Sequence, residues 1–149
     1  MTGNTVKDCS YGIYAQDVSG VACSGNQFRG LTVNWIYGQA IEDCQFSGNL
    51  VYAMDINQVC RMYNSKNVVL QSNDIIGNKA YAIYIPASNT GCIVTGNTMY
   101  GFTLENPITN PNGYTANNVP GSDTYTKTEI DAMFGSYITD IDTLVGGDA

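Results

Sequence analysis

The chain has 149 residues, of which 13% are charged, and it carries a net charge of −7 with no histidine. This acidic balance, without a basic cluster, argues against nucleic acid or an anionic membrane surface as a partner. No apolar stretch approaches the roughly 18 residues of a membrane span, so membrane insertion is not expected.

A ten-residue pattern recurs from about residue 4 to residue 119. Five of the six copies have an apolar residue three positions before an Asn or Cys anchor and another two positions after it, and Gly usually stands four positions after the anchor. The anchors are Cys9, Asn26, Cys44, Asn73, Asn97 and Asn118, and the glycines are Gly30, Gly48, Gly77 and Gly101. The mean spacing between anchors is about 22 residues, which is typical of a repeat architecture.

The pattern predicts a strand, a bend and another strand in each copy. The apolar positions before and after the anchor differ in parity, so the chain must bend at the anchor to bury both. Asn suits such a bend because it tolerates the left-handed backbone conformation. When coils stack at about 4.8 Å, the amides of successive anchors can bond to one another as a ladder.

This repeat resembles the right-handed parallel β-helix of the pectate-lyase-like superfamily. The resemblance implies an all-β solenoid of about five coils over residues 1–119. An ordinary β-sandwich with Asn-Gly turns is the alternative, but a sandwich has no reason to keep three residue columns in register. The repeat begins within a few residues of Met1 without a cap or a secretory signal, so we expect a solenoid that is truncated at its N-terminal end.

The cysteines are expected to be reduced residues of the core. They are Cys9, Cys23, Cys44, Cys60 and Cys92. Cys9 and Cys44, placed two coils apart in one column, would be about 9 to 10 Å from each other, too far for a disulfide. Because the chain has no CxxC pair and no histidine, neither a metal site nor a cofactor is expected.

Residues 120–149 are predicted to form a linker and an oligomerisation tail. Pro, Asn and Gly dominate residues 106–123 and end the repeat, and Thr126 with Glu129 then forms a capping box at the start of a helix. A short heptad seam follows at Ile130, Phe134, Tyr137, Ile141 and Leu144. An apolar stripe of this length needs a partner. Either further copies of the chain or the end of the solenoid, capped by the folded-back helix, would supply one.

Residues 125–133 resemble a phrase common near the ends of bacteriophage tail-fibre and prophage receptor-binding proteins. Together with a parallel β-helix, the phrase implies a tailspike or tail fibre, a virion protein that is made in the host cytoplasm. It also implies a homotrimer clamped by the tail, with bacterial surface polysaccharide as its partner. The missing signal and the tail phrase disfavour a stand-alone secreted carbohydrate-active solenoid.

Polysaccharide cleavage would need paired carboxylates. Asp43 and Asp55 are weak candidates. Asp8 and Asp43 each precede an anchor, which would place them on one outer ridge about 9 to 10 Å apart, at the upper edge of the inverting range. We expect solvated surface acids and a structural, adhesive role. The alternative is a depolymerase whose site lies between chains or in absent coils.

Aromatic residues offer candidates for glycan binding. Trp35 and Tyr37 flank Ile36, so an inward Ile36 would turn both rings outward together, where they could stack on sugar rings. Burial of this pair in a trimer interface is the alternative. The tyrosines of the other strands add further candidates.

Overall fold

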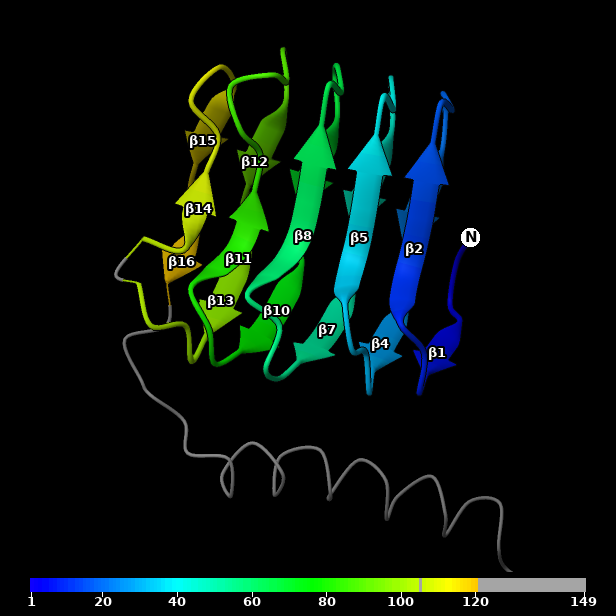
Figure 1. Cartoon of the computed structure of the whole chain (residues 1–149), viewed down its shortest axis with the longest axis vertical. Coiled ribbons are helices and arrows are strands. Elements are labelled where there is room, and N and C mark those ends of the chain that lie inside the picture. The colour runs from blue at the N-terminus through cyan, green and yellow to red at the C-terminus, as the bar shows by residue number, and fades with distance from the viewer. Residues whose placement is uncertain (105, 121–149) are drawn as a thin grey trace, which may run out of the picture.

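The structure is a computed structural model that describes residues 1–104 and 106–120 (Figure 1). All regular elements in this part are β-strands, and every strand pair is parallel. The predicted tail seam lies outside the described residues. Its members are Ile130, Phe134, Tyr137, Ile141 and Leu144.

The strands form three sheets, each built from one strand per coil. The first sheet contains β1 (Thr5–Lys7), β4 (Gln27–Arg29), β7 (Leu50–Ala53), β10 (Asp74–Gly77), β13 (Thr98–Tyr100) and β16 (Val119–Pro120). The second sheet contains β2 (Tyr11–Gln16), β5 (Asn34–Gln39), β8 (Gln58–Tyr63), β11 (Tyr81–Tyr84) and β14 (Ile108–Thr109). The third sheet contains β3 (Ala22–Ser24), β6 (Gln45–Ser47), β9 (Val69–Gln71), β12 (Ile93–Thr95) and β15 (Tyr114–Ala116).

The chain therefore winds through the three sheets in turn and makes a solenoid of about five coils (Figure 1). This arrangement confirms the predicted parallel β-helix and excludes the β-sandwich. A single apolar core runs between the sheets, with fully buried side chains such as Phe46, Leu70 and Ile83. The described part of the chain contains no helix that could span a bilayer.

An asparagine ladder runs along the corner between the third and first sheets. It consists of Asn4, Asn26, Asn49, Asn73, Asn97 and Asn118. From Asn4 to Asn97, the side-chain Nδ2 of each ladder asparagine donates to the Oδ1 of the asparagine in the next coil, at 2.8 to 3.0 Å. The backbone N–H of the same asparagine donates to that Oδ1 as well. The predicted ladder is confirmed, and its amides satisfy polar groups that the core buries.

Two of the predicted anchors are wrong. The ladder position belongs to Asn4 rather than Cys9 in the first coil, and to Asn49 rather than Cys44 in the third. Cys9 lies at the corner before β2, whereas Cys44 lies at the corner before β6, so the two cysteines do not share a column. All five cysteines are free thiols.

The bend lies one residue before each ladder asparagine. The left-handed positions are Gly3, Gly25, Gly48, Ser72, Gly96 and Asn117, with φ between 53° and 66°. The expectation that the anchor itself bends is therefore wrong. Gly48 belongs to this column, whereas Gly77 pairs with Ala53 in a separate column on the first sheet.

Candidate binding face

Several exposed or partly exposed tyrosines lie together on the outer side of the second sheet, which we call the tyrosine face. Its members lie in two columns across the strands. One column holds Tyr11, Asn34, Gln58 and Tyr81, and the other holds Tyr14, Tyr37, Arg61 and Tyr84. These positions are exposed or partly exposed apart from Asn34, and the residues between them fill the core.

Trp35 does not belong to this face. Its side chain is fully buried, and its ring lies 6.0 Å from that of Phe28. Strict alternation fails in β5 because Trp35 and Ile36 both point inward, and the same doubling occurs at the equivalent positions of β8 and β11. The prediction that Trp35 faces outward was therefore wrong, whereas Tyr37 is partly exposed on the tyrosine face.

The tyrosine rings form two groups. Tyr14 stacks on Tyr37 with ring centroids 5.2 Å apart and an interplanar angle of 11°, and Tyr11 packs edge-on against Tyr14 at 5.3 Å. On the other side of β8, Tyr81 and Tyr84 make an edge-on pair at 5.2 Å. These contacts hold the rings in fixed orientations with part of their surfaces open to solvent.

Polar side chains lie among the rings. The Tyr14 hydroxyl donates to Oε1 of Gln16 at 3.4 Å. A shallow hollow of about 320 Å³ lies over β5 and β8, lined by Val33, Asn34, Asn57, Gln58 and Arg61. Aromatic faces next to amide and guanidinium donors are the chemistry that carbohydrate sites use, because sugars present both apolar C–H faces and hydroxyls.

The acidic candidates are not paired. Asp55 lies at the corner before β8 and Asp43 at the corner after β5, so the six-residue width of the second sheet separates them, about 20 Å of extended chain. That separation exceeds the range of both glycosidase geometries. Asp8 lies against Gly30 at the corner before the second sheet, whereas Asp43 lies at the corner after it. The prediction that Asp8 and Asp43 share one ridge was therefore wrong.

Each acidic candidate instead has a local partner. Asp43 accepts a hydrogen bond from Asn67 at 2.9 Å. Asp55 accepts from Asn78 at 3.2 Å and pairs with Lys79 at 3.3 Å, and these contacts hold the pKa of Asp55 below its usual value. Both side chains are exposed and bonded as surface acids usually are.

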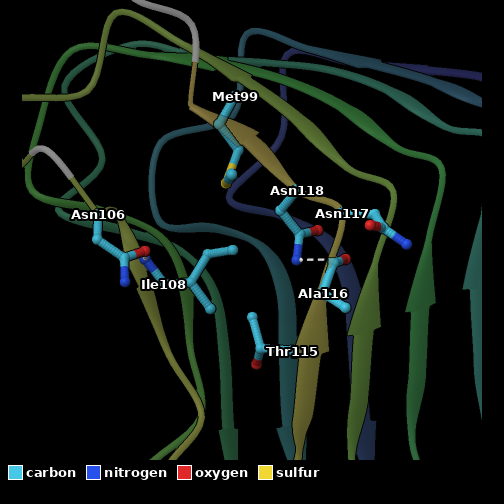
Figure 2. Close-up of a pocket in the computed structure, with 7 residues that line it drawn as sticks. All are labelled: Met99, Asn106, Ile108, Thr115, Ala116, Asn117 and Asn118. Atoms are coloured by element: carbon cyan, nitrogen blue, oxygen red, sulfur yellow. Dashed lines mark hydrogen bonds between the residues drawn. The ribbon is translucent and has the colours of Figure 1, made fainter.

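A second hollow, of about 250 Å³, lies at the last described coil. Figure 2 shows its lining from β13, β14 and β15 and the residues beside them. The lining residues are Met99, Asn106, Ile108, Thr115, Ala116, Asn117 and Asn118. None of these residues is ionisable, so the lining supplies no carboxylate pair for catalysis.

Arg61, Gln58 and Asn34 are site residues that the sequence patterns did not single out. The signal for them is the coil length: Tyr37 pairs with Arg61, and Arg61 pairs with Tyr84, at steps of one coil. Once the coils are correctly aligned, these residues fall into the columns of the tyrosines.

A protein-family model described as "NosD: Periplasmic copper-binding protein (NosD)" matches residues 1–134. No curated protein and no solved structure matches the chain. The family model covers the whole solenoid, and the family description raises the question of a copper site.

The donor set does not fit copper. Copper binds imidazole, thiolate and thioether ligands, but the chain has no histidine, and the thioethers of Met62 and Met99 are buried in the apolar core. Burial raises the pKa of the Cys23, Cys60 and Cys92 thiols and so keeps them protonated. No group of three or more His, Cys, Asp or Glu side chains that could hold a metal occurs among the described residues. Because the family model matches residues 1–134 of the 149-residue chain, the chain belongs to the NosD family.

Proposed function

We propose that the chain is the structural and adhesive shaft of a trimeric phage tail fibre or tailspike, and that its tyrosine face contributes to the recognition of bacterial surface polysaccharide. A parallel β-helix with a NosD domain is typical of adhesive and of carbohydrate-binding or carbohydrate-processing proteins. The resemblance of residues 125–133 to tail-fibre sequences supports the phage assignment and the trimer.

The observation that carries the proposal is the set of tyrosine rings on β2, β5 and β11 that share the outer side of the second sheet, with Arg61 of β8 between them. Neighbouring strands are about 4.8 Å apart, so the tyrosines and amides repeat in short steps along the solenoid axis. A polysaccharide laid across the strands can contact the open sides of the stacked Tyr14–Tyr37 pair and the Tyr84 ring in succession. Its hydroxyls then lie within reach of the glutamine and asparagine side chains.

An adhesive role fits the described acids better than a catalytic one. Asp43 and Asp55 occupy opposite edges of the second sheet, and one chain does not bring them to a common bond. The alternative, a polysaccharide depolymerase, requires a carboxylate pair shared between subunits or supplied by further coils. Release of reducing ends from polysaccharide would favour that alternative.

The test is the binding of purified bacterial surface polysaccharides to the full chain, measured by calorimetry. We expect the double variant Tyr14→Ala, Tyr37→Ala to bind about tenfold more weakly, because two stacking surfaces are lost. Tyr114→Ala is the matched control, since this exposed tyrosine lies on β15 of the third sheet. Equal affinity of the double variant and the wild type would contradict the proposal, and so would an equal loss in the control.

A further inference from the structure

Arg61 is the one charged residue within strands β2, β5, β8, β11 and β14 of the second sheet. It lies on β8, the central strand, in a chain whose net charge is −7. An isolated cation at the middle of a neutral aromatic face is unusual in so acidic a protein. It marks the position at which an anionic group of a ligand would be most stabilised.

The guanidinium group of Arg61 is oriented by its neighbour Tyr63. It lies over the Tyr63 ring at 4.7 Å from the centroid, and its Nε–H donates to the Tyr63 hydroxyl. These contacts use the Nε–H and one face of the guanidinium group. The N–H groups of the two terminal nitrogens, Nη1 and Nη2, therefore remain available to bind a ligand. A planar fork of this kind matches the two oxygens of a carboxylate.

No described carboxylate occupies that fork. The two ion pairs of the described residues join Lys66 to Glu42 and Lys79 to Asp55, and both lie at corners beside the second sheet. Each pair offsets the charge of one acid at a corner of the second sheet, which weakens the negative field that a ligand would meet near Arg61.

The hollow over β5 and β8 places Arg61 beside Asn34, Asn57 and Gln58. In the strand register, Arg61 lies between Tyr37 and Tyr84. A chain of sugars crossing the strands would thus meet a ring, a cation with amides, and a second ring in succession. This order combines stacking on both sides with a charged contact at the centre.

We infer that Arg61 makes the tyrosine face selective for polysaccharides whose sugars carry a carboxylate, with Arg61 binding that carboxylate and the flanking tyrosines binding the adjoining rings. The inference rests on the proposed glycan-binding function of the same face. It adds the chemical class of the ligand and the residue that selects it.

The experiment measures the affinity of the full chain for four probes: polygalacturonate, fully methyl-esterified polygalacturonate, dextran and dextran sulfate. We expect polygalacturonate to bind at least about tenfold more tightly than its ester, since a charge-assisted contact is lost on esterification. R61Q should abolish this difference, whereas R61K should retain part of it because the charge remains without the fork. R29Q is the matched control, because Arg29 lies on β4 of the first sheet. Thermal unfolding of each variant verifies that the fold is intact.

The outcomes separate the inference from the proposed function. If R61Q binds polygalacturonate as wild type does, or if R29Q loses as much affinity as R61Q, the inference is overturned. Equal binding of polygalacturonate and its ester, or binding of dextran sulfate alone, overturns it as well. If the Tyr14→Ala, Tyr37→Ala double variant weakens binding of a neutral probe in these cases, the glycan-binding face still stands. If the double variant leaves all binding unchanged, the proposed function fails too.

Discussion

At the scale of single residues, buried amides do most to determine the structure. Asn73 is fully buried, accepts from the backbone and side chain of Asn49, and donates to Phe46 and Asn97. Each of these groups lies away from water, so it depends on Asn73 for a partner. Polar groups inside this core are therefore stabilising only as a complete set.

Asn73→Ala is expected to lower the free energy of unfolding by about 2 to 5 kcal/mol, because it leaves several buried groups unpaired. Asn4→Ala, at the exposed first rung of the ladder, should cost about 1 kcal/mol. Urea unfolding of the two variants measures both losses. A larger loss at Asn4 than at Asn73 would contradict the importance of burial.

Cys60 should make stability depend on alkaline pH. Burial raises the pKa of its thiol in the folded state above the value of 9.0 for a free thiol, so the folded state favours the protonated form. This contribution is complete below pH 9.0 and decreases as the pH rises, by up to about 1.4 kcal/mol per pH unit. Urea midpoints between pH 8 and 10.5 under reducing conditions should fall less steeply in Cys60→Ala than in wild type. Parallel slopes in the two proteins would refute this assignment.

At the scale of elements, the sequence predicted strands and corners well but misaligned two coils. Phe46 follows Cys44 by two positions and precedes Asn49 by three, so both frames satisfy the apolar pattern. Hydrogen bonding to the adjacent coils decides for Asn49. With Asn49 in place the coils become nearly uniform in length, and only then do Tyr37 and Arg61 align. Trp35 is buried because two successive residues of β5, Trp35 and Ile36, both face the core. Strict alternation along a strand does not predict this.

The corner positions differ in how much room they offer. Gly101 has φ of 78°, and a Cβ there would lie within van der Waals overlap of the Gly77 carbonyl oxygen. Gly101→Ala should therefore cost about 3 kcal/mol or more. Gly25→Asn should cost about 1 kcal/mol or less, since nothing lies within 4 Å of its Cβ position and Asn117 occupies the equivalent corner. Thermal unfolding compares the two variants, and equal losses would show that φ alone, rather than space, governs these corners.

At the scale of the whole molecule, the fold was predictable because every coil of a solenoid repeats the same strands and corners. Each copy of the sequence pattern therefore supports the same architecture. The solenoid follows from this repetition, whereas the predicted association rests on the single segment after residue 120, which does not repeat. The trimer remains a prediction that rests on the sequence of that segment.

Light scattering should give the full chain about three times its mass of 16.1 kDa, because the heptad seam needs partner helices. A chain ending at residue 122 should have the mass of a single chain. If both are monomers, the trimer is wrong. If both are trimers, the tail is not the clamp and the solenoids associate through their own faces.

The asparagine ladder also governs how the molecule can change in length. Since each rung bonds only within its own coil and to the coils directly above and below, a whole coil of about 24 residues can be removed or duplicated while every remaining amide keeps an equivalent partner. Each added coil would extend the tyrosine face by about 4.8 Å. If the proposed polysaccharide binding is correct, the length of polysaccharide in contact with the tyrosine face would change in steps of one coil.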